Sequence, residues 1–331
     1  MAPTLGTDVA HAAGILRGGG LVAFPTETVY GLGADASSSA AVSRIFAVKG
    51  RPRAHPLIVH LAAAEQLDAW CESPGEAARA LAAAFWPGPL TLIARRASHV
   101  LDDVTGGAPT VGLRVPSHPM AQRLLAAFGD GVAAPSANRF GAVSPTTAAH
   151  VVADLGSDVD YILDGGACDV GVESTIVDIS GAVPALLRPG GVAREAIEAV
   201  LGHSLVVGSA TPAPGTLPSH YAPHARVIAV DAADLAAAVR DAERPTAVLA
   251  PAAVLAKITA SGPLPDGVTA LALPDDARAM AHELYGALRD LDGRGLATIV
   301  AALPPDAGLG AAVADRLRRA AGPRTVEDDH G

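Results

Sequence analysis

The apolar residues of this chain fall in short runs that alternate with segments of helical periodicity, and this alternation limits the fold more than any other feature. Runs such as 21–24, 57–61 and 110–115 have the length of buried strands, whereas 40–48 has apolar residues at helical spacing. Each element must bury its apolar side against another, so interleaved strands and helices indicate an α/β fold. The strands of this first part are spaced too irregularly for a simple doubly wound sheet, and we expect a mixed sheet.

The second half of the chain is more regular. A stretch rich in proline, alanine, serine and threonine precedes it, so we expect a first domain over 1–205, a linker over 206–225 and a C-terminal domain over 226–331 whose last residues fray. Strand and helix patterns then alternate, which predicts a smaller, Rossmann-like parallel α/β domain. Its strands are expected at 227–230, 247–250, 268–272 and 297–301, and its helices at 235–242, 276–291 and 311–320, with a weaker one after Pro251.

Composition and charge exclude several classes of protein. A formal net charge of -10 argues against broad, salt-driven binding of nucleic acid, although a local patch can still bind phosphates. Cys71 and Cys168 match no metal-site spacing and fit a reducing compartment. We find neither a signal-peptide pattern nor an apolar stretch as long as a membrane helix. We therefore expect a soluble, cytoplasmic protein.

The segment 46–60, FAVKGRPRAHPLIVH, is a basic island in this acidic chain. It carries Lys49, Arg51, Arg53 and His55 and no acid, and its lysine is one of only two in the sequence. An ammonium is a point charge and a guanidinium is a planar fork, and phosphate sites often use one of each. The segment is therefore either an anion site or a solvated basic loop, because charge runs usually lie in solvent.

Two polar residues within apolar strands are candidates for ligand contacts. Arg114 lies near the end of the strand expected at 110–115, where a cation must find an anion or an exposed edge. It binds a carboxylate or phosphate, or it forms a structural ion pair. His60 lies in the apolar run 57–61, and a histidine there is more often a core residue than a ligand.

Two further segments are rich in hydroxyls and glycine. Segment 25–36, PTETVYGLGADA, is expected to be a strand-to-loop transition, either an ordinary glycine turn or a place where the backbone approaches a ligand closely. Segment 131–153 contains no acidic residue, and we expect a helix to begin within it, near Thr146 or Thr147. Its hydroxyls, an amide and free N–H groups at the helix N-terminus would form an anion cradle. The side chains concerned are Ser136, Asn138, Ser144, Thr146 and Thr147.

The common nucleotide and catalytic motifs are absent from the sequence. It contains no G-x-x-x-x-G-K-[ST] loop, and the GLGAAV segment at 308–313 fails the dinucleotide fingerprint at its last position. No Ser-His-Asp or Cys-His arrangement and no H-E-x-x-H motif stands out. Any phosphate site must therefore be of another kind.

The segments together resemble the YrdC-like family of L-threonylcarbamoyladenylate synthases, in the long form with an additional C-terminal domain. The resemblance covers nearly the whole chain, and several independent motifs in order make it specific. It is carried by PTETVYGLG, KGRPRAHPLIVH, FWPGPLTL, GLRVP, APSAN, SPTT, GVESTIVD, LLRPGG and the linker motif HYAP. A YrdC-like twisted mixed-sheet domain is the fold that this resemblance implies.

The resemblance also implies a reaction. Enzymes of this family join L-threonine, bicarbonate or CO2, and ATP, with release of pyrophosphate, and Mg²⁺ accompanies the ATP. The product, threonylcarbamoyl-AMP, passes to a separate transferase machinery that modifies A37 of tRNA to t6A. Charge develops on the phosphates, so the protein mainly positions the substrates and stabilises that charge. We expect little or no direct tRNA binding and no membrane association.

Residue roles follow from the motif positions. The resemblance implies that four residues hold threonine or its carbamate: Thr28, His60, Arg114 and Ser174. It implies that ATP is surrounded by Lys49, Arg51, His55, Thr110, Ser136, Asn138, Ser144, Arg188 and Tyr221. Lys49 and Arg51 would be the catalytic cations, and no protein ligand for the metal can be named. Members of the family often have a neutral amide at the position of His55. A histidine there would make the contact with ATP pH-sensitive.

The linker motif suggests a lid. Tyr221 lies far beyond Arg188 in the sequence and reaches ATP only if the linker folds back over the active site. Two other functions remain open for such a chain. One is an RNA-binding module, since YrdC-like domains have a basic concave face, although overall acidity opposes it. The other is a carbamoyl-transfer protein of the hydrogenase-maturation type, whose additional zinc-finger and acylphosphatase-like regions this sequence lacks.

Overall fold

The computed structural model describes residues 4–217, 219–260 and 262–323, so the predicted fraying of the C-terminal residues falls outside the described residues. The chain forms two compact units. The first comprises Met1–Phe140 and Ser144–Thr216, and the second comprises Gly141–Val143 and Leu217–Gly331. The division at 216/217 falls inside the segment that the sequence predicts as a linker.

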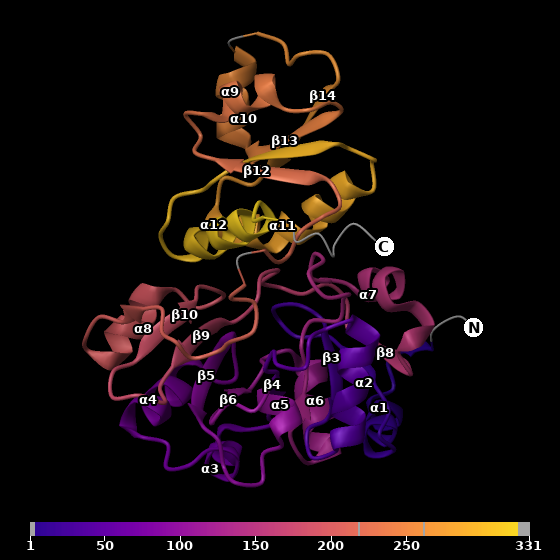
Figure 1. The fold of residues 1–331 in the computed structure, drawn as a ribbon, viewed down its shortest axis with the longest axis vertical. Coiled ribbons are helices and arrows are strands. Elements are labelled where there is room, and N and C mark those ends of the chain that lie inside the picture. The colour runs from indigo at the N-terminus through magenta and orange to yellow at the C-terminus, as the bar shows by residue number, and fades with distance from the viewer. Residues whose placement is uncertain (1–3, 218, 261, 324–331) are drawn as a thin grey trace. The chain divides into compact units, whose positions relative to one another are not determined.

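The first unit is built on one mixed sheet, which has eleven strands in the described residues (Figure 1). In spatial order the strands are β1 (Leu5–Gly6), β8 (Tyr161–Leu163), β2 (Val22–Phe24), β3 (Gly31–Asp35), β7 (Val132–Ala133), β4 (Ile58–His60), β6 (Thr110–Arg114), β5 (Leu90–Arg95), β9 (Thr175–Asp178), β10 (Ala185–Arg188) and β11 (Val206–Val207). Consecutive strands such as β2 and β3, β5 and β6, and β9 and β10 pair antiparallel, whereas β4 with β6 and β5 with β9 pair parallel. This confirms the predicted mixed sheet.

Helices with clear sequence signals cover this sheet. Asp8, Ser38 and Thr147 cap α1, α2 and α7 with their side chains, because a short polar side chain satisfies the free N–H groups of the first turn. The core that these helices close is aliphatic and alanine-rich, as a chain with 3% aromatic residues requires. The helices are α1 (Val9–Arg17), α2 (Ser39–Lys49), α3 (Leu67–Trp70), α4 (Glu76–Phe85), α5 (Asp102–Thr105), α6 (Pro119–Phe128), α7 (Ala148–Leu155) and α8 (Arg194–Leu201).

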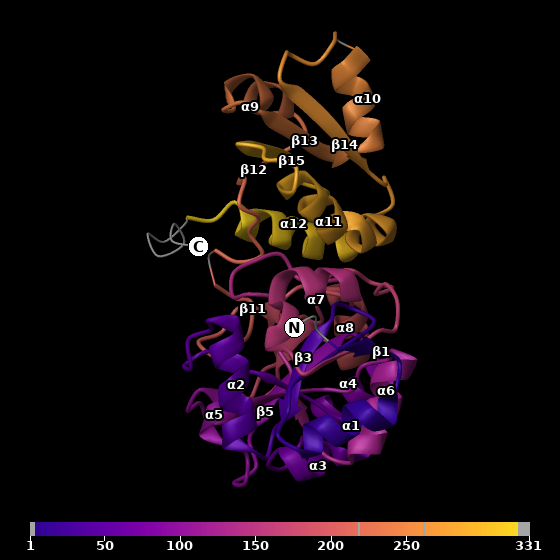
Figure 2. The same cartoon turned by 90° about the vertical axis from the view of Figure 1, so that its right-hand side faces the viewer.

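The second unit is a parallel α/β domain, as predicted. Its four-stranded sheet has the order β12 (Arg226–Val230), β15 (Thr298–Ala302), β13 (Thr246–Pro251) and β14 (Val268–Leu273), and every pair is parallel. Figure 2 shows α9 (Leu235–Asp241) and α10 (Ala252–Ala260) on one side of this sheet, and α11 (Ala277–Asp292) and α12 (Leu309–Ala320) on the other.

The interpretation of segment 25–36 as a strand-to-loop transition was incomplete, because its second half is strand β3. Glycines are needed there for packing rather than for a turn. A Cβ atom on Gly33 would lie 2.8 Å from both Phe24 and Val132 side chains on the neighbouring strands. Only a residue without a side chain allows these neighbours to approach so closely.

The first half of the predicted linker is fixed to the first unit. Val206–Val207 adds the edge strand β11, parallel to β10. The Ser209 and Thr211 hydroxyls donate to Asp178 Oδ2 at 3.1 and 2.5 Å, and Ala213 is buried with Ile93 and Ile176 in a small apolar cluster. Segment 206–216 is therefore an ordered extension of this unit.

Candidate active site

Two of the residues predicted to hold threonine, His60 and Arg114, lie in one row across neighbouring strands. His60 on β4 and Arg114 on β6 are direct partners in the sheet register. Leu113 of β6 pairs with Leu92 of β5, so continuing the register by one residue places Thr91 opposite Arg114. Residues directly opposite each other project from the same face of a sheet. His60, Arg114 and Thr91 therefore share one face.

Ser174 adjoins this row at the next strand, two residues before Ile176, which is the register partner of Thr91. β5 and β9 are parallel, with Leu90 beside Thr175, so Ser174 lies just before the start of β9. The Oγ1 of Thr91 and the Oγ of Ser174 are 2.7 Å apart, and both residues are buried. Four separate parts of the chain thus supply these side chains, and the sheet topology brings them together.

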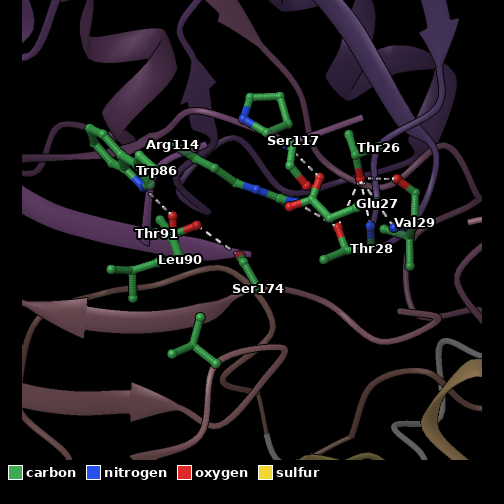
Figure 3. A network of polar contacts seen from close by, with 12 residues as sticks. Thr26, Glu27, Thr28, Val29, Trp86, Leu90, Thr91, Arg114, Ser117 and Ser174 are labelled. Carbon is green, nitrogen blue, oxygen red and sulfur yellow. Dashed lines mark hydrogen bonds and ion pairs between the residues drawn. The ribbon is translucent and has the colours of Figure 1, made fainter. Parts of the chain in front are cut away.

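Arg114 has a buried acidic partner that the sequence did not reveal. Its Nη2 donates to Glu27 Oε1 at 2.7 Å and to Thr28 Oγ1 at 2.9 Å (Figure 3). The backbone N–H of Ser117 donates to the other carboxylate oxygen at 3.0 Å. The side chains of Arg114 and Glu27 are only 5% and 6% exposed. The structural ion pair that the sequence left open is therefore present.

The ion pair leaves most of the Arg114 guanidinium available for a ligand. A guanidinium has five N–H donors, and within the described residues Arg114 forms hydrogen bonds only through Nη2. The buried Nε has no hydrogen-bond partner among the described residues. A buried, unpartnered donor is costly, and a planar set of such donors matches a carboxylate. Glu27 thus orients the Arg114 guanidinium and leaves N–H donors of that group for a ligand.

Thr26 and Thr28 form a tight polar turn beside this pair (Figure 3). The Thr26 hydroxyl donates to the Val29 carbonyl at 2.6 Å, so the 2.8 Å contact between the two threonine hydroxyls has Thr28 as its donor. Thr28 Oγ1 also accepts from Arg114. The hydroxyl proton of Thr28 is therefore already used inside the protein, and its remaining capacity is to accept a hydrogen bond.

His60 is held neutral in this row. Burial, followed by the nearby Arg114 cation, lowers the pKa of His60 to about 3. Its ring lies edge-on to Phe24 at 5.8 Å, and its Nδ1 is buried with no hydrogen-bond partner among the described residues. Backbone groups of Ile58 and Val132 also interact with the ring and partly offset the lowering of the pKa. The site therefore contains a neutral imidazole whose Nδ1 can still form a hydrogen bond with a polar ligand.

Arg188 connects Ser174 to the ordered part of the linker. Its Nε and Nη2 donate to the Ser174 carbonyl at 3.2 and 2.8 Å, and Nη2 also reaches Ser174 Oγ at 3.3 Å. Its Nη1 donates to the Pro214 carbonyl at 3.1 Å. The side chain is 3% exposed.

Lys49 joins the two segments that the sequence singled out as anion-binding. It is the last residue of α2, which Gly50 ends in the left-handed conformation with φ 64°. Its Nζ donates to the carbonyl oxygens of Ser136 and Asn138 at 2.7 and 2.5 Å. Burial, and then the neighbouring Arg51, lowers the pKa of Lys49 well below its usual value.

The other basic residues of segment 46–60 divide into buried and exposed ones. Arg51 is buried, donates to the Pro56 carbonyl at 2.9 Å and lies 5.5 Å from the ring centre of Phe140. The half-buried His55 meets the same ring edge-on at 5.4 Å, and burial followed by Arg51 lowers its pKa. Arg53 is exposed and pairs with Asp103, so the solvated-loop interpretation applies to that residue alone.

The remaining predicted ATP residues lie at several places. Ser144 is buried and donates to Glu173 Oε1 at 2.6 Å. Asn138 is buried next to the Lys49 contact, and Ser136 is half-buried. Thr110 begins β6 beside Arg95, at the opposite end of that strand from Arg114, so its assignment requires a nucleotide that extends along the strand.

Tyr221 belongs to the second unit. Its ring stacks on Tyr285 of α11 at 5.9 Å, and the guanidinium of Arg316 lies 5.0 Å from its centre. The residue is 2% exposed and has a φ of 63°, which is unusual for a side chain of this size. The assignment of Tyr221 to ATP stays a prediction.

Sequence reasoning missed three buried polar residues that contact the predicted site: Glu27, Thr91 and Glu173. Glu27 had one signal, since it is the only acid close to the threonines of PTET and a buried arginine needs an anion. The partners of Thr91 and Glu173 are distant in sequence, and no local pattern marks them.

No helix in the part of the chain that the structure describes is long and apolar enough to cross a membrane. No group of three or more metal-ligating His, Cys, Asp or Glu side chains occurs there.

Comparison with known proteins agrees with this architecture. Residues 14–190 match the Sua5/YciO/YrdC family, described as telomere recombination, and residues 192–322 match the C-terminal domain of threonylcarbamoyl-AMP synthase. The threonylcarbamoyl-AMP synthase of Pyrococcus abyssi is 43% identical over 323 residues, covering 96% of this chain and 94% of that protein. That of Bacillus subtilis is 40% identical over 331 residues, with the same coverage. The crystal structure of P. abyssi Sua5 complexed with L-threonine has a TM-score of 0.86 and 39% identity over 97% of each chain.

A mixed-sheet α/β unit, followed in the chain by a parallel α/β unit, is the architecture of a two-domain YrdC-like enzyme. The chain belongs to the Sua5/YciO/YrdC family, and its relatives over nearly the full length are threonylcarbamoyl-AMP synthases. It is an enzyme of that class.

Proposed function

We propose that the first unit makes threonylcarbamoyl-AMP from L-threonine, bicarbonate or CO2, and ATP, with the threonine in the row formed by His60, Arg114, Thr91 and Ser174. The observation that carries this assignment is the unused donor capacity of the buried Arg114, beside a neutral imidazole with a vacant nitrogen. Donors on Arg114 suit the carboxylate of an amino acid. Acceptors on Glu27 and Thr28 suit its ammonium group.

The chemistry needs no protein nucleophile. The threonine ammonium first loses a proton to solvent, and the resulting amine nitrogen attacks the carbon of CO2 and loses a second proton, which gives a carbamate. A carbamate oxygen then forms a bond to the α-phosphorus of ATP, and the bond from that phosphorus to the bridging oxygen of pyrophosphate breaks. The residues of this chain hold the two reactants in line and stabilise the charge that develops on the phosphates.

Lys49 and Arg51 are the proposed catalytic cations. Both are buried in a net-acidic protein, and Lys49 links the Ser136–Asn138 segment to α2. His55, Thr110, Ser144, Arg188 and Tyr221 complete the proposed ATP contacts, with Mg²⁺ carried by the phosphates. The role of the segment 206–225 as a lid is part of this proposal, and the contact of Arg188 with Pro214 supports it for the first half of the segment.

The product would pass to the transferase machinery that installs t6A on tRNA, and we expect this to happen in the cytoplasm. Direct tRNA binding by this chain would be weak, because the net charge is -10. An RNA-binding module is the alternative that this argument disfavours.

Pyrophosphate release tests the proposal. With Mg²⁺ and ATP present, release should require both threonine and bicarbonate, and it should be lost in Lys49→Ala. Consumption of ATP without threonine would indicate another acceptor. Absence of turnover together with tight tRNA binding at physiological salt would favour the RNA-binding module.

A further inference from the structure

The hydrogen bond between Thr91 and Ser174 has a direction that the surrounding contacts decide. The two oxygens are 2.7 Å apart, and either can be the donor on distance alone. Thr91 is 0% exposed and Ser174 is 1% exposed, so water cannot complete their hydrogen bonding. For Thr91 Oγ1, the described residues supply no other polar partner than Ser174.

Only one of the two hydroxyl protons can be used within the pair. Ser174 Oγ also lies 3.3 Å from Arg188 Nη2, which can only donate. If Thr91 donates as well, Ser174 accepts from a charged and a neutral donor, and its own proton is polarised towards a further acceptor. The reverse direction would leave the unused proton on Thr91, the second residue of β5, which is 0% exposed and for which the described residues supply no other acceptor.

We propose that Thr91 is a positioning residue whose hydroxyl donates to Ser174 and thereby makes the Ser174 O–H an obligatory donor to the carboxylate of the bound amino acid. Arg114 lies on the other side of Thr91 in the same row, with its own unused N–H groups. A charged and a neutral donor flanking one position match the two oxygens of a carboxylate. The inference rests on the proposed threonine site and adds a residue to it.

The test measures binding of L-threonine in the absence of ATP by calorimetry. Thr91→Val removes the hydroxyl at nearly constant shape, and we expect threonine to bind about tenfold more weakly, the usual effect of one buried hydrogen bond near a charged ligand. Thr91→Ser keeps the hydroxyl and should bind threonine within about twofold of the unmodified protein. ATP binding should be the same in all three.

A matched control separates this role from a loss of stability. Thr105 is also a buried threonine of the first unit, and its hydroxyl accepts from Arg96 rather than from a site residue. Thr105→Val should leave threonine binding unchanged. L-Threonine methyl ester, which lacks the carboxylate charge, should bind weakly to the unmodified protein. Its affinity should decrease little further in Thr91→Val.

A double-mutant cycle with Ser174→Ala completes the test. Because Thr91 acts through Ser174, Thr91→Val should cause no additional loss in the Ser174→Ala background. If Thr91→Val does not fold, Thr91→Ala takes its place in the cycle. If Thr91→Val and the unmodified protein bind threonine equally well, the role of Thr91 is wrong but the proposed function still stands. The same conclusion follows if Thr91→Val weakens the binding of ATP and of threonine to the same extent. Failure of the unmodified protein to bind threonine would overturn the proposed function as well.

Discussion

His60 and Arg114 are direct partners on the parallel strands β4 and β6, so a buried imidazole and a buried guanidinium project side by side from one face of the sheet. A second cation next to Arg114 would be strongly unfavourable in this environment. Burial, and then the adjacent Arg114 cation, lower the pKa of His60 to about 3, so the imidazole stays neutral.

The first prediction concerns stability at acid pH. Between about pH 6.5 and the folded-state pKa of about 3, the unfolded chain takes up a proton on His60 that the folded chain does not. Above about pH 6.5, His60 therefore does not reduce the free energy of unfolding. As the pH falls below that value, the free energy of unfolding decreases. The contribution is at most about 1.4 kcal/mol per pH unit. Urea unfolding at several pH values measures it.

His60→Asn is the comparison for that measurement. The variant lacks the titrating ring, so its free energy of unfolding should change less between pH 6 and pH 4 than that of the unmodified protein. Parallel curves for the two proteins would mean that His60 titrates normally in the folded state.

The second prediction concerns the buried pair of Glu27 and Arg114. Removal of one member of a buried ion pair leaves the other charge uncompensated, which typically costs about 3–5 kcal/mol. Glu27→Ala should therefore reduce the free energy of unfolding by about that amount. In the double variant with Arg114→Met the loss should be smaller than the sum of the single losses, because no unpaired charge remains.

An exposed pair provides the control. Asp68 and Arg79 form a salt bridge in which both side chains are more than half exposed, so Asp68→Ala should change stability little. Additive losses for Glu27→Ala and Arg114→Met would show that the buried pair does not contribute as a unit.

The sequence predicted the class of both units because their alternation of strand and helix is local information. Strand β3 was missed since Gly31–Asp35 lacks the β-branched residues of an ordinary strand, and its glycines serve the packing of Phe24. The order of linker segment 206–216 was also missed. Its hydroxyls are typical of a loop, and their acceptor Asp178 lies in a strand about thirty residues earlier.

The residues of the candidate site were also only partly predictable from the sequence. Lys49 and the segment containing Ser136 and Asn138 were each recognised by composition, and the structure brings them into contact through two backbone carbonyls. Thr91 was not recognised, because a single threonine in an apolar segment has no signature of its own, and only the sheet register places it beside Arg114. Glu27 was not recognised because its partner Arg114 is distant in sequence and contacts it from strand β6.

The third prediction concerns Lys49. Burial lowers its pKa, and a bound triphosphate would raise it again by supplying nearby negative charge. ATP binding should therefore be accompanied by proton uptake, which calorimetry in buffers of different ionisation enthalpy detects. Lys49→Met should lose this uptake and should slow pyrophosphate release by about 10²–10³, the usual effect of removing one donor from a charged transition state.

Lys257 is the matched control, since it is the other lysine of the chain and is exposed on α10. Lys257→Met should retain both proton uptake and turnover. Unchanged proton uptake in Lys49→Met would assign the proton to another group and remove Lys49 from the phosphates.

The fourth prediction concerns the attachment of the linker by Asp178. Burial alone would raise the pKa of this carboxyl, but hydrogen bonds from Ser180, Thr211 and Ser209 outweigh it, and the pKa is lowered. The resulting stabilisation is complete above the unfolded-state pKa and is lost as the pH falls through the lower folded-state pKa. At neutral pH, Asp178→Asn should weaken these contacts, because an amide is a poorer acceptor than a carboxylate. Backbone hydrogen exchange over 206–213 should then be faster, while exchange in the sheet of the second unit stays the same. Unaltered exchange over 206–213 would show that β11 and the apolar contacts of Ala213 hold the segment without Asp178.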